Sequence, residues 1–305
     1  MEAPTALRPS VRVAVGSLID YAGLFPPAEL PLESARAEYD AARRGPHAWM
    51  LGRFIIRAPL LDADPDAVCG PLSVIVDPNA EAFNGIAALR ARGAKVEAVE
   101  IPLQKSLSPF RERISEYEVL DIAGALEASL VTTGLRDLPA FLEIPRTQPW
   151  HDVLVPTMRA LARTKLGAKL RCGGLTADAF PGVDEVVAFI VAAHQAGVAF
   201  KATAGLHHPV RRRDETTGFT MHGFLNLLAA AALAQRLSPE TLAQIVAEED
   251  PRAFQFDDES FAWRDESVDL VELVATRRER FVSYGSCSFD EPVADLTTLG
   301  LLDAG

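Results

Sequence analysis

Short apolar runs rich in β-branched residues alternate along this chain with longer segments of helical periodicity. The runs occupy residues 15–23, 49–58, 72–78, 96–103, 140–145, 168–174, 199–208 and 280–289. Segments with helical spacing lie between them, at 32–44, 80–93, 152–167 and 183–197. This alternation is typical of βα units around a parallel sheet. Eight units predict an α/β protein with the (β/α)8 TIM-barrel fold.

An open, doubly wound sheet is the competing α/β architecture. It commonly carries a glycine-rich phosphate fingerprint after its first strand. Neither GxGxxG nor GxxxxGK[ST] occurs in the sequence, which favours the barrel.

One connection is longer than a barrel needs. Residues 209–279 separate the seventh and eighth runs and include an Ala/Leu-rich helix (FLNLLAAAALAQR) and a second helical segment that Ser238 could cap. We interpret 209–279 as a helical insertion or lid, with 1–305 as a single TIM-barrel domain. A separate small domain is the alternative, although no flexible linker brackets the segment.

Composition limits the classes of partner. The chain has 305 residues, is 49% hydrophobic and carries a net charge of -12, so neither nucleic acid nor an anionic membrane is an expected partner. No signal-peptide pattern opens the chain, and a cytoplasmic location is expected. Its three cysteines form no CxxC pair and predict no disulfide framework. The Ala/Leu helix has enough apolar surface for a homo-oligomer, but a buried helix gives the same pattern.

Active sites of TIM barrels gather at the carboxyl ends of the strands, so polar residues near these ends are the first candidates. They are Asp20, Arg53, Asp77, Glu100, Glu143, Lys169, Arg171, Lys201 and Thr203.

Lys169 and Lys201 are the most informative of these candidates. Each lies among apolar neighbours, so it either points into the barrel or lies outward beneath a helix. On adjacent strands, two inward lysines would lower each other's pKa and favour the neutral amine that attacks a carbonyl.

The carboxylates and histidines leave alternatives open. Asp20, Glu100 and Glu143 either form structural salt bridges at the barrel mouth or transfer protons. His207 and His208, with His222 beyond them, are candidates for hydrogen bonding or substrate contact, and alternatively for metal binding.

Several strand ends resemble the deoxyribose-phosphate aldolase family. Ile19-Asp20-Tyr21 before AGLFPP is similar to its IDHT-type opening, and FLEIP to its fifth strand. Lys169-Leu-Arg-Cys-Gly resembles its KTSTG strand, Lys201-Ala-Thr-Ala-Gly-Leu its KASGGI strand, and FVSYGSCS its final RxGxSS strand.

The resemblance implies a class I aldolase with Lys169 as the Schiff-base lysine and Lys201 as its partner. The family's fourth-strand Asp has no identical counterpart, and Glu100 is the nearer of two glutamates to that strand end. AGLHHPVRRR replaces the family's phosphate loop, which predicts a different substrate.

Three functions follow from these residues. The first is an aldolase-like lyase that forms a Schiff base with a small carbonyl substrate, for which an anionic group is one option, and needs no cofactor. Its catalytic residues would be Lys169, Lys201 and Glu100, and its substrate-binding residues Asp20, Arg53, Glu143, Arg171, Thr203, His207, His208, Gly285, Ser286 and Ser288. The second is a divalent-metal isomerase or hydrolase using Asp77, Glu100, Glu143 and a histidine. The third is a non-enzymatic barrel that binds a ligand through residues 209–279.

Overall fold

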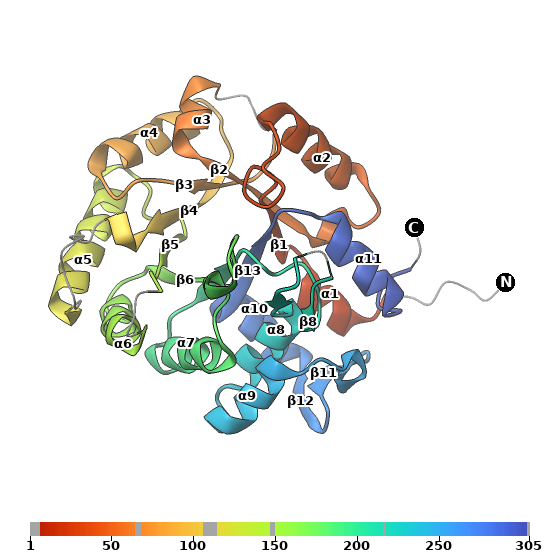
Figure 1. Ribbon diagram of the computed structural model, residues 1–305. Helices are drawn as coiled ribbons and strands as arrows, with labels where there is room; N and C mark the ends of the chain where they lie inside the picture. The colour runs from red at the N-terminus through yellow and green to blue at the C-terminus, as the bar shows by residue number, and fades with distance from the viewer. Residues whose placement is uncertain (1–6, 65–68, 106–114, 147–149, 216, 304–305) are drawn as a thin grey trace.

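Eight parallel strands form a closed barrel in the computed structural model, which describes residues 7–64, 69–105, 115–146, 150–215 and 217–303 (Figure 1). Around the barrel the strands follow the order β1-β13-β7-β6-β5-β4-β3-β2, so the first strand pairs with the last one. The barrel strands are β1 (Ile19–Tyr21), β2 (Leu51–Arg57), β3 (Leu72–Ile75), β4 (Val96–Pro102), β5 (Ala140–Glu143), β6 (Gly167–Arg171), β7 (Phe200–Thr203) and β13 (Phe281–Ser286). The predicted TIM barrel is confirmed.

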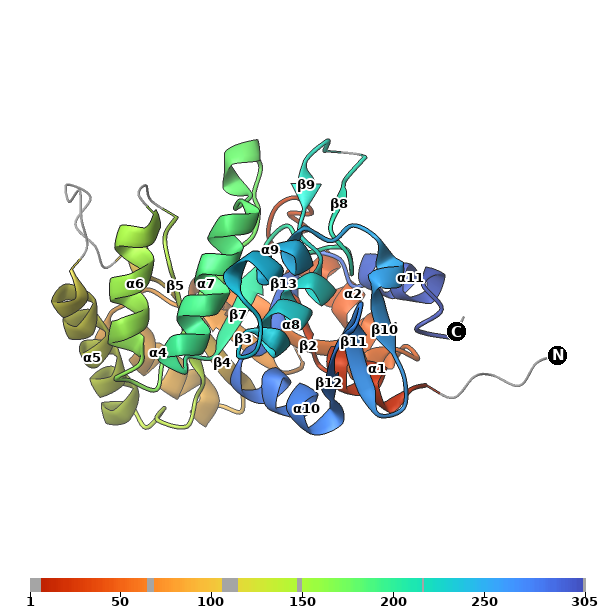
Figure 2. The same ribbon diagram turned by 90° about the horizontal axis from the view of Figure 1, so that it is seen from below.

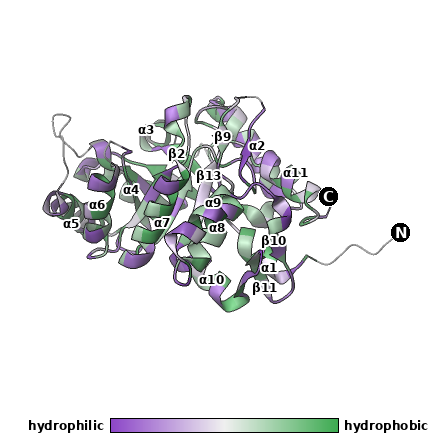
Figure 3. Ribbon diagram, turned by 60° about the horizontal axis from the view of Figure 1, so that its bottom comes forward, coloured by the Kyte–Doolittle hydropathy of each residue, from purple (hydrophilic) through white to green (hydrophobic). Residues whose placement is uncertain are grey.

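Helices surround the barrel and bury their apolar sides against it. They are α1 (Pro9–Val15), α2 (Leu32–Arg44), α3 (Ala58–Ala63), α4 (Ala80–Ala91), α5 (Glu116–Thr132), α6 (Trp150–Leu161), α7 (Val183–Ala196) and α11 (Asp290–Thr298). Figure 3 shows α4 to α7 with both hydrophobic and hydrophilic residues, as expected for helices between a core and solvent. The predicted helices match α2, α4, α6 and α7, whereas α1, α3, α5 and α11 were not predicted.

Local chemistry fixes several helix ends. The Asn79 side chain accepts a hydrogen bond from Ala82 N, and Ser115 caps α5 in the same way. Gly197 ends α7 in the left-handed conformation that glycine adopts at least cost.

Residues 209–279 contain helices and two small sheets. The hairpin of β8 (Arg212–Arg213) and β9 (Thr220–Met221) projects from the side where β7 ends (Figure 2). The segment continues as α8 (Phe224–Leu233), α9 (Pro239–Ala247), an antiparallel sheet of β10 (Phe254–Phe256), β11 (Ser260–Trp263) and β12 (Glu266–Asp269), and α10 (Leu270–Glu279). Ser238 caps α9 as predicted, whereas the three-stranded sheet was not predicted.

The Ala/Leu helix is α8, and its apolar side chains are buried within the chain itself. Phe224, Leu225, Leu227 and Leu228 have no exposed surface, and α8 contacts α7, α9 and α10. The buried-helix alternative therefore accounts for its composition. In the part of the chain that the structure describes, no helix combines the length and apolar character needed to cross a bilayer.

Candidate active site

Lys169 and Lys201 both point into the barrel. They are register partners on β6 and β7, and their side chains are 5% and 0% exposed. Side chains alternate between the two faces of a strand, so the apolar residues beside each lysine face the surrounding helices. Of the two orientations that the sequence left open, both lysines adopt the inward one.

Glu100 on β4 lies between the two ammonium groups. Its Oε2 is 2.6 Å from Lys169 Nζ, and its Oε1 is 2.5 Å from Lys201 Nζ. Ser73 on β3 also donates a hydrogen bond of 2.6 Å to Glu100 Oε1. Because Glu100 is 1% exposed, these contacts replace the water that would otherwise solvate the carboxylate.

Asp20 on β1 completes the inner end of the network. Lys201 Nζ and the Ser283 hydroxyl donate to its Oδ2 at 2.7 and 2.8 Å, and the Arg53 backbone N–H donates to its Oδ1 at 2.8 Å. The backbone must come close to this carboxylate at Gly52, where a Cβ would overlap Asp20 Oδ1.

Glu143 lies at the outer end of the network. It is the register partner of Lys169, its Oε2 is 2.8 Å from Lys169 Nζ, and its side chain is 15% exposed. Arg171, half-exposed at the end of β6, has its Nη1 4.0 Å from Glu143 Oε1. Charges of alternating sign thus run from the interior to the carboxyl-end mouth. We call Asp20, Glu100, Glu143, Lys169 and Lys201 the lysine cluster.

The carboxylates determine the charge state of Lys169. Burial alone would lower its pKa, but Glu100 and Glu143 outweigh burial and hold that pKa above its usual range. Burial alone would raise the pKa of Glu100, but Lys169 and Lys201 outweigh it and hold that pKa below its usual range. The expectation that the lysines lower each other's pKa is wrong for Lys169, because Glu100 lies between the two amines.

Thr203, Gly285 and Ser286 lie around the same mouth. Thr203 and Gly285 are register partners on β7 and β13, and a Cβ at Gly285 would lie 3.1 Å from Thr203 Oγ1. Ser286 is buried and its Oγ accepts a hydrogen bond from Ser288 N at 3.4 Å. Ser288 Oγ accepts from Glu291 N in the first turn of α11, so both hydroxyls support the start of this helix.

His207 and His208 follow β7 and contact α11 rather than the lysine cluster. His207 Nδ1 lies 2.7 Å from Glu291 Oε2, and His208 Nδ1 lies 2.7 Å from Asp295 Oδ2. Both rings are buried, so these carboxylates supply the polar contacts that burial demands. The pair joins the loop after β7 to the last helix.

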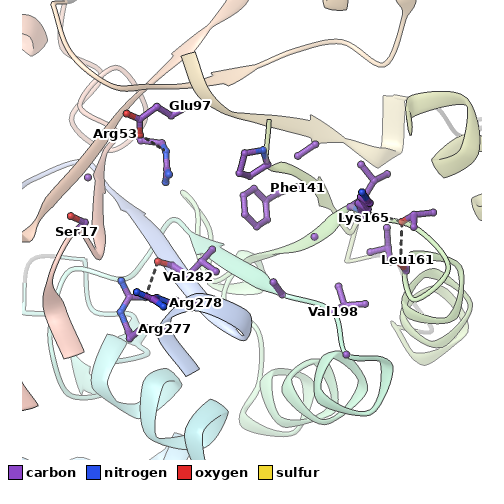
Figure 4. A pocket seen from close by; sticks show the side chains of 18 of the residues that line it. Ser17, Arg53, Glu97, Phe141, Leu161, Lys165, Val198, Arg277, Arg278 and Val282 are labelled. Carbon is purple, nitrogen blue, oxygen red and sulfur yellow. Dashed lines mark hydrogen bonds and ion pairs between the residues drawn. The ribbon is translucent and has the colours of Figure 1, made fainter. Parts of the chain in front are cut away.

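Arg53 lies at the opposite end of the barrel. It lines a cavity of about 830 Å³ at the amino ends of the strands, where its Nε is 3.4 Å from Glu97 Oε2 (Figure 4). Phe141 also lines this cavity, and its ring centroid lies 5.7 Å from Lys201 Nζ. Arg53 Nη1 is also 3.9 Å from Asp20 Oδ1, so the side chain reaches the inner end of the lysine cluster but not the carboxyl-end mouth.

The remaining basic residues of this cavity have a structural explanation. Lys165 follows α6, and Arg277 and Arg278 lie in the last turn of α10, close to helix ends that carry partial negative charge. The Arg277 guanidinium donates to the carbonyls of Phe281 and Val282.

The donors of the metal hypothesis do not converge. Asp77 is exposed beyond β3, whereas Glu100 and Glu143 face lysine ammonium groups. His222 Nε2 donates to Pro181 O at 2.8 Å, and burial together with nearby arginines lowers the pKa of His222 to about 4. Among the described residues, no three His, Cys, Asp or Glu side chains are grouped as metal ligands.

Sequence analysis missed two hydroxyl donors of the site, Ser73 and Ser283. Each lies at an inward position of its strand and contacts a buried carboxylate. A single serine in an otherwise apolar strand was the available signal, but such a residue is common in barrel strands without any role in a site.

No protein-family model and no curated protein sequence matches this chain. Similar solved structures include dihydrodipicolinate synthase from Bacillus clausii, with 12% identity, a TM-score of 0.30, and coverage of 78% of this chain and 70% of that one. Another is a mandelate oxidase mutant with 3,3,3-trifluoro-2,2-dihydroxypropanoic acid, with 14% identity, a TM-score of 0.36, and coverage of 81% and 78%.

Proposed function

We propose that this protein is a class I aldolase-like lyase that forms a Schiff base between Lys169 and a small carbonyl substrate. The observation that carries the proposal is the placement of Lys169 Nζ within 2.6 Å of Glu100 and 2.8 Å of Glu143, with Lys201 behind Glu100. A buried amine flanked by proton acceptors is suited to covalent catalysis on carbonyls. The resemblance of both lysine strands to the deoxyribose-phosphate aldolase family supports the same assignment.

Lys169 must lose a proton before it attacks, because the adjacent carboxylates keep it charged at rest. Glu143 is the better acceptor for that proton. It is partly exposed, and among the described residues its Oε1 has only the distant contact with Arg171, whereas Glu100 already faces two lysines and Ser73. Glu143 therefore takes the proton, and Glu100 holds the two amines in position.

The chemistry then follows from the neutral amine. Lys169 Nζ forms a bond to the carbonyl carbon, and the carbonyl oxygen takes up a proton to give a carbinolamine. Loss of water gives an iminium ion, which accepts the electron pair released when the neighbouring carbon–carbon bond or α C–H bond breaks. Glu143 receives the proton that leaves the substrate and returns it when the enamine is protonated.

Arg171 favours a substrate with a negative charge. Its Nε donates to Gly173 O at 3.0 Å, which fixes the guanidinium at the mouth, and the side chain is 50% exposed. An arginine in this position can bind a carboxylate or a phosphate through two hydrogen bonds. Thr203 and Gly285 form the neighbouring part of the mouth.

Trapping of the iminium tests the proposal. The protein is incubated with a panel of short aldehydes and ketones, including acidic ones such as pyruvate, and reduced with borohydride; peptide mass spectrometry then identifies the modified lysine. We expect an adduct on Lys169 that Lys169→Met abolishes. Lys165→Met is the matched control, because Lys165 is an exposed lysine at the other end of the barrel, and should leave adduct formation unchanged. Labelling of surface lysines alone across the panel would overturn the proposal.

A further inference from the structure

A second cluster of reactive side chains lies at the rim of the barrel, where β13 leads into α11. Cys287 follows the last residue of β13, and its Sγ is 3.8 Å from His207 Nε2. The other ring nitrogen of His207, Nδ1, is 2.7 Å from Glu291 Oε2. The three side chains come from three parts of the chain, namely the end of β13, the loop after β7, and α11.

The arrangement matches that of an activated cysteine nucleophile. In such sites a histidine contacts the sulfur through one nitrogen, and an acidic group orients the ring through the other. Glu291 accepts only, so His207 Nδ1 carries a proton, and the second nitrogen can hold the proton released by the thiol. Burial alone would lower the pKa of His207, but contacts with Cys287 and Glu291 outweigh it and raise that pKa to about 10.

Cys287 is the more exposed member of the pair. It is partly exposed, whereas His207 is 8% exposed, so reagents can approach the pair from the Cys287 side. The next residues along the chain, Ser288 and Phe289, line with Tyr21 a cavity of about 300 Å³ between α2 and α11.

The elements that face this site present further charged groups. Tyr21 of β1 donates a hydrogen bond to Glu38 of α2 at 2.6 Å, and Asp290 lies on α11. Glu38, His47 and Asp290 all line the same cavity.

We propose that Cys287, His207 and Glu291 form a nucleophilic thiol site that reacts with peroxides and is separate from the lysine cluster. The sulfur attacks the terminal oxygen of a hydroperoxide, so an S–O bond forms and the O–O bond breaks. Cysteine is oxidised by two electrons to the sulfenic acid, and the peroxide is reduced. The departing hydroxide or alkoxide takes a proton from His207 Nε2 and leaves as water or an alcohol.

The chain contains its own controls for this site. Cys69 is an exposed free thiol without a histidine contact among its described interactions, and Cys172 is a buried one whose pKa burial raises to about 12. The rate of carbamidomethylation by iodoacetamide is measured for each cysteine at pH 6 by quantitative peptide mass spectrometry. We expect Cys287 to react about tenfold faster than Cys69, because His207 lies beside the Cys287 sulfur and can hold the proton that the thiol releases. Cys172 should remain unmodified while the protein is folded.

Variants assign the effect to the cluster. His207→Gln should bring the rate at Cys287 to within about twofold of the rate at Cys69, and Glu291→Gln should reduce it by a smaller factor. With hydrogen peroxide and dimedone, the sulfenic acid should be trapped at Cys287 and not at Cys69. Continued protection of Cys172 shows that each variant is folded.

Two results would overturn the site: a rate at Cys287 no higher than at Cys69, or an unchanged rate in both folded variants. Lys169→Met should leave the rate at Cys287 unchanged. Failure of the lysine chemistry and failure of the thiol site are therefore distinguished by separate readouts on the same protein.

Discussion

Glu100→Gln is the sharpest test of how the lysine cluster is stabilised. The substitution keeps the shape of the side chain and an oxygen that can accept from Ser73, but removes the charge that lies 2.6 and 2.5 Å from two buried ammonium groups. Removing one partner of a buried ion pair costs about 3–5 kcal/mol, because the remaining charge is left uncompensated. Asp20 and Glu143 still contact the lysines, so we expect the lower end, about 3 kcal/mol.

Urea unfolding at pH 7, followed by tryptophan fluorescence, measures this loss. With a denaturant dependence of about 3 kcal/mol/M, the unfolding midpoint should fall by about 1 M. Glu97→Gln is the matched control on the same strand, because Glu97 is 52% exposed and water screens its contact with Arg53. It should change stability by less than about 1 kcal/mol. Equal effects of the two substitutions would refute the reasoning.

The pH profile, two substitutions and a double variant give further tests. The pKa of Glu100 is lowered in the folded protein, so its stabilisation should be lost in acid, below about pH 4. The pKa of Lys169 is raised, so its stabilisation should be lost above about pH 10. Urea midpoints measured across the pH range check both limits. Tyr284→Phe should raise stability by about 1 kcal/mol, since the buried hydroxyl has no hydrogen-bond partner in the described structure, and calorimetry would expose a loss instead. Ser238→Ala should lower stability by about 1 kcal/mol through loss of the α9 cap, and an unchanged urea midpoint would contradict this. Combining Glu100→Gln with Lys169→Met should cost less than the sum of the single losses by about 1–3 kcal/mol, whereas additive losses would show that the two charges are uncoupled.

The barrel could be predicted because its strands and helices follow local hydrophobic patterns. The helix prediction over 32–44 matches α2 residue for residue, and the sixth and seventh apolar runs overlap β6 and β7. The sheet of β10 to β12 could not be predicted in the same way. Its strands are three or four residues long, and such short segments show too few alternating positions to separate a strand from a loop.

The sequence indicated which residues could form the site better than it indicated how their side chains are arranged. The positions of the strand ends made Glu100, Lys169 and Lys201 candidates, and the family resemblance grouped them; the structure places their side chains in contact. The raised pKa of Lys169 depends on the ångström-scale placement of Glu100 between the amines, which no spacing in the sequence encodes. The position of the Arg53 side chain could not be predicted either. A residue of β2 near the barrel interior can point toward the amino end or the carboxyl end of the barrel, and Arg53 points toward the amino end.

The pairing of β1 with β13 has a consequence for how the protein is made. Asp20 emerges early from the ribosome, yet its partners Lys201 and Ser283 lie 181 and 263 residues further along the chain. Until those residues have been synthesised, the carboxylate has neither its cation nor its hydroxyl donor, and burying it would be unfavourable. The first strands therefore remain in partly open assemblies during translation, and closure of the barrel follows only when the last strand is available.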